Sequence, residues 1–316
     1  MHRIALVVSP GFQMMSLAAI SAFEFANFVA GRPVYDIRIL SESGGPVRSS
    51  LGLMMETTAL NEGSADTVVF GGGLGILDVS PAVLAFARQS LGSARRVASF
   101  CTGAFVLAEA GVLDGRRATT HWAAARELQT RYPRIKVDQD RIFIVDGPVW
   151  TSAGASAGID LALGMIDQDL GPDVCRAVAR KLVLYHRRAG GQSQHSALLD
   201  LDAKSDRIQS ALDYAKRNLE KPLTVEDLAE VAHLSPRQFS RAFRAETGQS
   251  PAKAVETLRI EAARLLLEQS NHPIEIIAAQ TGFADRERMR RAFLRAFGQP
   301  PQAIRRVTHG VQVPAD

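Results

Sequence analysis

Two segments near the C-terminal end of this 316-residue chain repeat one pattern of apolar residues. The first is TVEDLAEVAHLSPRQFSRAFRAETGQSP (224–251) and the second is PIEIIAAQTGFADRERMRRAFLRAFGQPP (273–301). The offset between aligned residues is 49 before a short turn and 50 after it, so the second turn holds one inserted residue. Each copy predicts a helix, a turn and a second helix. The last third of the chain is therefore predicted to be an all-α domain with two helix-turn-helix motifs.

The second helix of each copy has an apolar face and a charged face. At helical spacing we expect a core face made of Phe239, Ala242, Phe243, Met289, Ala292, Phe293 and Ala296. The other face holds the early exposed turns that a recognition helix presents to base edges. We expect this face to contact double-stranded DNA through Arg237, Gln238, Arg241, Arg286, Glu287, Arg288 and Arg291. Each arginine alone suits a phosphate contact or a solvated charge as well as base readout, and the paired arrangement favours readout.

A long amphipathic helix is predicted between the copies, over SPAKAVETLRIEAARLLLEQS (250–270). About 19 residues at 1.5 Å each span about 28 Å. Successive major-groove entries on one face of DNA lie about 34 Å apart. One chain can therefore place its two recognition helices in adjacent grooves.

The first 190 residues alternate short Val- and Ile-rich strands with helical patterns. The predicted strands are RIALVV (3–8), YDIRIL (35–40), TVVFGG (67–72), RVASF (96–100) and VWTSA (149–153). This alternation predicts an α/β doubly wound parallel sheet, in which ligands bind at the carboxyl ends of the strands. Residues 71–73, 101–103 and 152–154 fall at three such ends, so we expect them to line one crevice.

Cys101 lies where a predicted strand passes directly into a helix. The N-terminal amides of that helix lower a thiol pKa and offer N–H donors to an oxyanion. His121, in ATTHW, is a candidate base or orienting group. Cys175 lies inside a helical pattern and is interpreted as a core residue.

The cysteine content excludes two classes of protein. The two cysteines lie far apart, with no CxxC and no histidine spacing suited to zinc, so we expect no disulfide framework, no metal site and no cofactor. Pro10-Gly11 stops the first apolar run and Glu24 interrupts the next, so we expect no signal peptide and no membrane span. We therefore predict a cytoplasmic protein.

A change of composition marks the domain boundary. The segment AGGQSQHSALLDLDAK is rich in Gly, Gln and Ser and lacks a strong period. We predict a first domain over 1–190, a linker over 191–205 and a DNA-binding domain over 206–310. The stretch RRAGGQSQHS suits a solvated linker and a functional segment about equally.

Three stretches of the first domain carry a family resemblance. GGG (71–73), FCTGAFVLAEAGVLDGRRATTHW (100–122) and TSAGASAGIDLALGMI (151–166) resemble the DJ-1/PfpI branch of the class I glutamine amidotransferase-like fold. The resemblance implies that Cys101 is the elbow residue and that oxyanion donors come from Thr102 and from Gly72 or Gly73. It also implies an acid from the first strand-helix region, but the first helix offers Ser16 there and Glu24 lies about two turns beyond it, so that acid is missing. We therefore predict an effector site made of Gly72, Gly73, Cys101, Thr102, His121 and Ser152.

The repeated helices resemble the AraC/XylS DNA-binding domain through HLSPRQFSRAFRAETGQSP, LRIEAARLLLE and TGFADRERMRRAFLRAFGQPP. His233 departs from the Gly usual in the first turn, which affects turn strain more than function. A DJ-1/PfpI-like domain followed by this domain resembles the GlxA family of transcriptional regulators. The resemblance implies a homodimeric DNA-binding regulator whose first domain senses a small, nitrogenous metabolite, with RNA polymerase as a further partner.

Two alternatives remain open on the sequence. Cys101 could make the chain a hydratase-like or amidase-like enzyme, or it could be a thiol redox sensor, in either case tethered to DNA. Because no base completes the nucleophile, the sequence favours a domain that binds its ligand without turnover.

Overall fold

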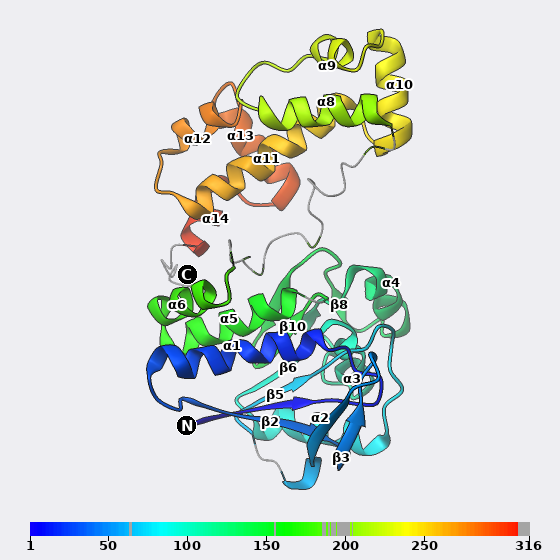
Figure 1. The fold of residues 1–316 in the computed structure, drawn as a ribbon, viewed down its shortest axis with the longest axis vertical. Coiled ribbons are helices and arrows are strands. Elements are labelled where there is room, and N and C mark those ends of the chain that lie inside the picture. The colour runs from blue at the N-terminus through cyan, green and yellow to red at the C-terminus, as the bar shows by residue number, and fades with distance from the viewer. Residues whose placement is uncertain are drawn as a thin grey trace. The chain divides into compact units, whose positions relative to one another are not determined.

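The structure is a computed structural model that describes residues 1–62, 65–154, 156–184, 188, 190, 194, 203 and 205–308 (Figure 1). The chain divides into two compact units, Met1–Gln194 and His195–Asp316. This division falls inside the segment 191–205 that we expect to be the linker. Most of that segment lies outside the described residues, so the boundaries at 190 and 206 stay predictions.

An eight-stranded sheet forms the centre of the first unit, in the order β3-β4-β2-β1-β5-β6-β10-β9. Its strands are β1 (His2–Val7), β2 (Tyr35–Ser41), β3 (Ser43–Arg48), β4 (Met54–Ala59), β5 (Thr67–Phe70), β6 (Arg96–Phe100), β9 (Phe143–Asp146) and β10 (Val149–Ser152). From β4 to β10 neighbouring strands run parallel, which confirms the doubly wound sheet. The two edge strands, β3 and β9, run antiparallel to their neighbours, and the sequence did not predict them. A separate pair joins β7 (Arg117–Ala118) and β8 (Lys136–Val137).

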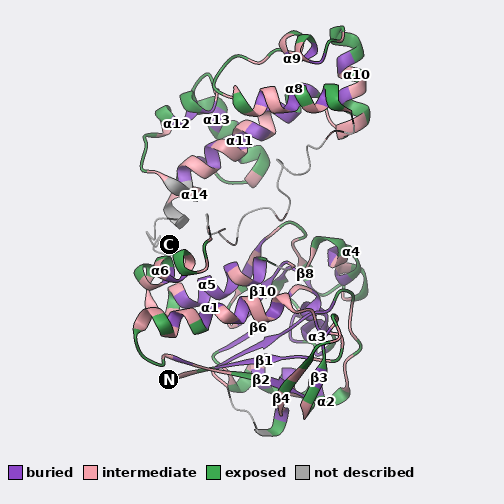
Figure 2. Ribbon diagram, in the orientation of Figure 1, coloured by how far each residue is buried: buried purple, intermediate pink, exposed green. Residues whose placement is uncertain are grey.

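Helices cover both faces of this sheet. They are α1 (Met15–Ala30), α2 (Pro81–Ser93), α3 (Ala104–Glu109), α4 (Trp122–Arg131), α5 (Ala157–Leu170) and α6 (Pro172–Lys181). Apolar side chains of α1, α5 and α6 form one core with the sheet, and those of α2 and α3 form the other, so the central strands are buried (Figure 2). Cys175 belongs to the first core, where its thiol donates to the carbonyl oxygen of Leu163 at 3.3 Å, which confirms its structural interpretation.

The second unit is helical. Its helices are α8 (Asp206–Arg217), α9 (Val225–Val231), α10 (Pro236–Thr247), α11 (Pro251–Gln269), α12 (Ile274–Gln280), α13 (Arg286–Phe297) and α14 (Pro301–Thr308). Helices α9 and α10 form the first predicted helix-turn-helix pair, and α12 and α13 form the second. Side chains cap the second helix of each pair, since Ser235 accepts from the amide of Gln238 and Asp285 accepts from the amide of Arg288.

Helix α11 belongs to two hydrophobic cores. Its first half packs Ala254 and Leu258 with α8, α9 and α10, and its second half packs Ala263 and Leu267 with α12 and α13. The predicted core face of the two recognition helices is confirmed for the aromatic residues and for Met289 and Ala292. It is wrong for Ala296, which is exposed; in this last turn of α13 it is Phe297 that packs against the core.

No helix in the described part of the chain has the length and apolarity that a bilayer crossing requires.

Candidate functional site

Cys101 lies at a sharp turn at the carboxyl end of β6. Its φ is 54°, in the left-handed region that residues other than glycine seldom adopt, and its amide donates to the carbonyl oxygen of Ala153 at 3.2 Å. The chain then passes through one tight turn into α3. Cys101 is half-buried, so the strained elbow presents its side chain at the surface of the unit.

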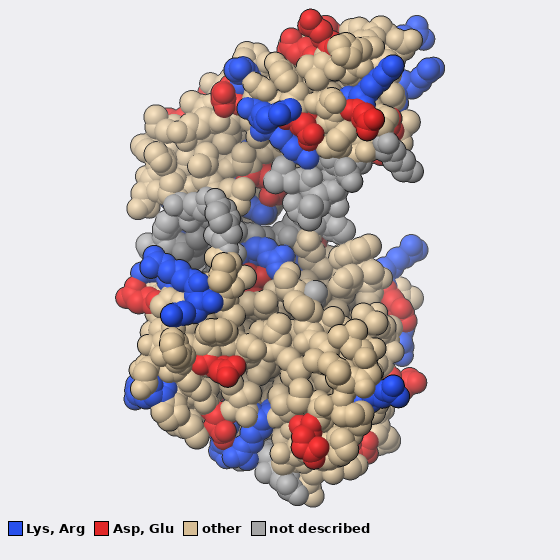
Figure 3. Space-filling view, in the orientation of Figure 1, with Lys and Arg blue, Asp and Glu red and all other residues tan. Residues whose placement is uncertain are grey.

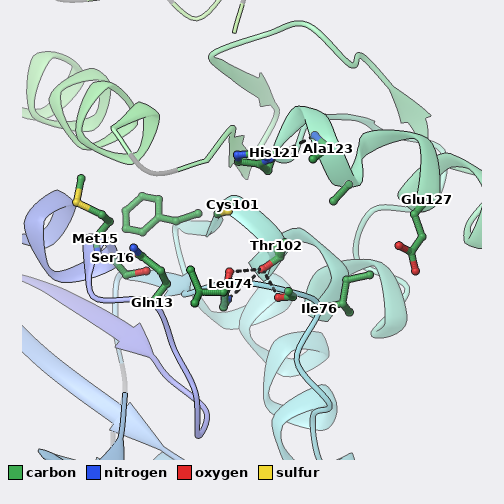
Figure 4. Close-up of a pocket in the computed structure, with 15 residues that line it drawn as sticks. Gln13, Met15, Ser16, Leu74, Ile76, Cys101, Thr102, His121, Ala123 and Glu127 are labelled. Carbon is green, nitrogen blue, oxygen red and sulfur yellow. Dashed lines mark hydrogen bonds between the residues drawn. The ribbon is translucent and has the colours of Figure 1, made fainter. Parts of the chain in front are cut away.

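A cavity of about 380 Å³ opens at this elbow (Figure 4). It is lined by Gln13, Met15, Ser16, Gly72, Gly73, Leu74, Gly75, Ile76, Phe100, Cys101, Thr102, His121, Ala123, Ala124 and Glu127. Five of the six predicted effector residues are brought together here, from the ends of β5 and β6 and from the start of α4. The volume suits a small molecule, since ligand sites commonly enclose about 300–1,000 Å³.

Ser152 is the sixth predicted residue, and it does not line this cavity. It is fully buried, and its hydroxyl lies 3.4 Å from the carbonyl oxygen of Ser99 and 3.2 Å from that of Ala153. These contacts join β10 to β6 beneath the elbow. The structure therefore gives Ser152 a place in the sheet, because its side chain points into the interior.

Thr102 ties the elbow to the glycine-rich loop that follows β5. Its hydroxyl accepts from the amide of Gly73 at 3.0 Å and donates to the carbonyl oxygen of Gly75 at 3.0 Å. Because the Gly73 N–H is used in this contact, Gly72 is the residue of this pair that suits an oxyanion donor. A Cβ at Gly72 would lie 2.7 Å from the amide nitrogen of Thr102, so the two backbones meet directly.

His121 precedes α4 and caps it. Its Nδ1 accepts from the amide of Ala123 at 3.2 Å, so the proton of the neutral ring lies on Nε2. A Cβ at Gly154 would lie 2.0 Å from the imidazole, so the glycine after β10 makes room for the ring. Figure 4 shows Cys101 between the His121 ring and the Thr102 side chain.

Ser16 and Glu127 are the remaining polar groups of interest. Ser16 lines the cavity from α1, the helix from which the family resemblance implies an acid. Glu24 is exposed and does not line the cavity. Glu127 is an acid that sequence reasoning missed. It lies three and four residues after Ala124 and Ala123 on one face of α4, and its carboxylate is 3.5 Å from Arg131. The sequence carries no signal for it, because only the structure shows that these two alanines line the cavity.

Within the described residues, no group of three His, Cys, Asp or Glu side chains is arranged to hold an ion.

The first recognition helix, α10, presents all three of its predicted DNA-binding side chains to solvent. Within the described residues, no carboxylate forms an ion pair with Arg237 or Arg241. Gln238 has a local partner, because its side-chain oxygen accepts from the amide of Ser235 at 3.3 Å and completes a capping box. Two arginines of α10 are therefore available to an anionic partner, while Gln238 also stabilises the start of the helix.

The second recognition helix, α13, exposes its four predicted residues, and each of them forms an ion pair with a neighbouring charged side chain. Arg286 lies 3.1 Å from Glu275, and Glu287 contacts Arg290 at 2.8 Å and Arg291 at 3.9 Å. The hydrogen bond from Arg290 holds the pKa of Glu287 below its ordinary value. Figure 3 shows basic and acidic side chains scattered among uncharged ones on the visible surface of the helical unit.

The two units match two known domain families. Residues 2–168 match the DJ-1/PfpI family, and residues 228–307 match a helix-turn-helix domain. The crystal structure of an AraC family transcriptional regulator from Pseudomonas putida has the same fold over 58% of this chain and 100% of its own, with a TM-score of 0.54 and 23% identity. The order of the matches repeats the order of the two units.

Curated relatives span nearly the whole chain. The HTH-type transcriptional regulator GlxA of Rhizobium meliloti is 34% identical, over 96% of this chain and 96% of its own. The regulator CdhR of Pseudomonas aeruginosa is 33% identical, over 94% of this chain and 90% of its own. An isonitrile hydratase of Pseudomonas putida is 36% identical, but over only 49% of this chain and 69% of its own. The chain therefore belongs to the family of HTH-type transcriptional regulators, GlxA among them, that join a DJ-1/PfpI domain to an AraC-type helix-turn-helix domain.

Proposed function

We propose that this DNA-binding regulator reads two adjacent major grooves with α10 and α13, and that a small molecule in the cavity at Cys101 controls this activity. The observation that carries the proposal is a ligand-sized cavity at a strained elbow in a chain that also bears two exposed, arginine-rich recognition helices. Glu127 at the cavity supports a ligand with an amino group, and the Thr102 and Gly72 amides support one with a carboxylate or carbonyl. The proposed effector is thus a small nitrogenous metabolite.

The DNA-reading part is tested with sequences selected by the chain itself from random duplex DNA. Arg241 and Arg291 occupy corresponding exposed turns, so Arg241→Ala and Arg291→Ala should each cost about 1–3 kcal/mol and relax specificity in a different half of the site. Footprinting of both variants measures this, with Arg176→Ala in α6 as the control. Equal weakening along the whole site would mean phosphate contacts in place of base readout.

The sensing part is tested at Cys101. A thermal-shift screen of amino acids, amines and their breakdown products identifies a compound that binds the folded chain. Cys101→Ser keeps size and polarity, so it should retain that shift with modest loss. Cys101→Trp fills the cavity and should abolish it while operator binding is unchanged. Loss of operator binding in the Trp variant would show that the substitution disturbs more than the cavity.

An enzymatic role is the second candidate, favoured by the similarity of one half of the chain to an isonitrile hydratase and by the elbow cysteine. We propose that the cavity binds its ligand without turnover, because Ser16 stands in the first helix where a catalytic acid would be expected. Conversion of the bound compound by the purified chain, lost in Cys101→Ser, would reverse this assignment. A change of operator affinity on treatment with peroxide would instead identify a redox sensor.

Assembly is a separate part of the proposal. We propose a homodimer formed through the first unit, which would double the number of grooves contacted, and contact with RNA polymerase at the target promoter. Sedimentation velocity of the full chain measures the first, and co-purification with polymerase on operator DNA measures the second.

A further inference from the structure

Gln194 makes an unusual number of contacts for a residue of a predicted linker. Its side-chain nitrogen donates to the carbonyl oxygens of Thr120 at 2.9 Å and Gln139 at 3.2 Å, and lies 3.2 Å from the hydroxyl of Thr119. Its side-chain oxygen accepts from the amide of Trp122 at 2.9 Å. One amide group thus bridges the two residues that flank His121.

These contacts need both halves of an amide. The carbonyl oxygens of Thr120 and Gln139 require a donor, and the N–H of Trp122 requires an acceptor, so a carboxylate or an apolar group would leave at least one of them without this partner. Gln194 is therefore matched to this position by its chemistry and not only by its length.

The bridged segment is a wall of the cavity. The hydroxyl of Thr120 donates to the carbonyl oxygen of Cys101 at 2.8 Å, and the amide of Thr119 donates to the hydroxyl of Thr151 at 2.9 Å. His121, between the residues that Gln194 holds, lines the cavity directly. A displacement of this wall by a ligand therefore has a direct path to Gln194.

The chain around Gln194 is fixed to the first unit at further points. The amide of Gln194 donates to Asp140 at 2.8 Å. Six residues earlier, the guanidinium of Arg188 lies 2.7 Å from the buried carboxylate of Asp160 and donates to the hydroxyl of Ser156 at 2.8 Å. Gln194 is also the last residue of the first unit, and the chain continues from it into the helical unit.

We propose that Gln194 is a positioning residue of the cavity, and that its side-chain amide couples the His121 wall to the last residue of the first unit. The inference rests on the proposed sensing function, which gives the coupling its biological role. The coupling itself can be measured without a metabolite. Occupation of the cavity shifts the wall, the wall changes its hydrogen bonds to Gln194, and the main chain at Gln194 responds.

The first test measures the wall without any effector. Hydrogen exchange of the full chain reports the Trp122 amide, and iodoacetamide reports the accessibility of Cys101, because Cys175 is buried. Gln194→Ala should speed exchange at Trp122 and alter the alkylation rate of Cys101 by about 3- to 10-fold, as expected for one lost hydrogen bond. Gln89→Ala, an exposed glutamine of α2, is the matched control and should change neither. Unchanged exchange at Trp122 in Gln194→Ala overturns the proposal.

The second test measures the coupling, with the carboxamidomethyl group on Cys101 as the occupant of the cavity. Alkylation of the wild-type chain should change exchange of the Gln194 amide by at least about 3-fold, and in Gln194→Ala the same amide should not respond. An amide at 194 that exchanges equally in free and alkylated wild-type chains contradicts the coupling, whatever a metabolite screen finds. A screen that finds no effector would contradict the proposed function and leave this result standing.

A conservative variant separates positioning from bulk packing. In Gln194→Glu the carboxylate faces two carbonyl oxygens at neutral pH, but its protonated form regains one donor. At each pH, the alkylation rate of Cys101 in this variant is divided by the rate in the wild-type chain. This ratio should equal the ratio for Gln194→Ala at pH 8, and it should return towards one at pH 5. Asp140 and His121, the titratable groups that adjoin this segment, are common to both chains and leave the ratio unaffected. A ratio independent of pH overturns the assignment.

Discussion

His233 and Gly282 occupy equivalent positions in the turns of the two helix-turn-helix pairs, 49 residues apart. Both have a left-handed backbone, with φ of 53° at His233 and 74° at Gly282. A Cβ at Gly282 would lie 1.9 Å from the carbonyl oxygen of Leu219, so glycine is required there by close approach as well as by conformation. At 233 the turn accepts a side chain at the cost of strain, as the sequence led us to expect.

We predict opposite effects of substitution at these two turns. Left-handed backbone costs a residue other than glycine about 1–2 kcal/mol, and part of this is offset by the greater freedom of glycine in the unfolded chain. His233→Gly should therefore raise the free energy of unfolding of the helical unit by up to about 1 kcal/mol, and Gly282→Ala should lower it by more than about 2 kcal/mol. Urea unfolding followed by circular dichroism measures both.

Tryptophan fluorescence supplies the control for this pair, since the two tryptophans, Trp122 and Trp150, belong to the first unit. Their unfolding transition should be the same in both variants. A fluorescence shift in either variant would mean that the two units do not unfold separately.

At the scale of elements, a polar cluster joins β6 to the end of α5. Arg96, fully buried at the start of β6, contacts both carboxylate oxygens of Asp169, and the hydroxyl of Tyr35 donates to the same carboxylate at 3.1 Å. Burial acts to raise the pKa of Asp169, but the hydrogen bond and charge of Arg96 outweigh it and hold that pKa below the ordinary 3.8. Burial and the carboxylate together raise the pKa of Tyr35.

We predict that Asp169→Asn lowers the free energy of unfolding of the first unit by about 3–5 kcal/mol, because it leaves the Arg96 charge buried without its partner. A depressed carboxyl pKa stabilises the folded state above the ordinary value, and this stabilisation is lost as the pH falls through the folded pKa. Wild-type stability, read from the tryptophan fluorescence of the first unit, should therefore fall below about pH 4, and the variant should lose this part of the dependence. Asp173→Asn, at a well-exposed ion pair, should change stability by less than about 0.5 kcal/mol; an equal effect of both substitutions would refute the role of burial.

The same scale shows what the sequence could predict. The five central strands are runs of apolar residues that need no partner to be recognised, and the structure confirms them with boundaries within two residues. Strands β3 (SGGPVR) and β4 (MMETTA) are rich in Gly and polar residues, so only their pairing with each other and with β2 makes them strands. Local pattern therefore determines the interior of this sheet, and tertiary contact determines the edge formed by β3 and β4.

At the scale of the whole molecule, the sequence predicted those parts of the site whose geometry follows from the local pattern of the chain. Cys101 and Thr102 follow from a strand that runs into a helix, and the helix-turn-helix repeat follows from its period. Gln194 was assigned to a polar linker, because the main-chain groups that hold it carry no signature in the sequence. Ser152 was included for its place at a strand end, although β10 is buried along its whole length and the Ser152 hydroxyl contacts main-chain oxygens inside the sheet.

Helix α11 fixes the register in which the chain can read DNA. Because its two halves lie in the cores of the two helix-turn-helix pairs, the separation and relative rotation of α10 and α13 are set by one rigid element. Each base pair inserted between the half-sites turns the second one by about 34° around the DNA axis. We expect an insertion of five base pairs to reduce affinity to that of a single half-site, whichever base pairs are added, and gel-shift titration of spaced operators measures this. Operators of this regulator are consequently defined by helical phase as much as by base sequence.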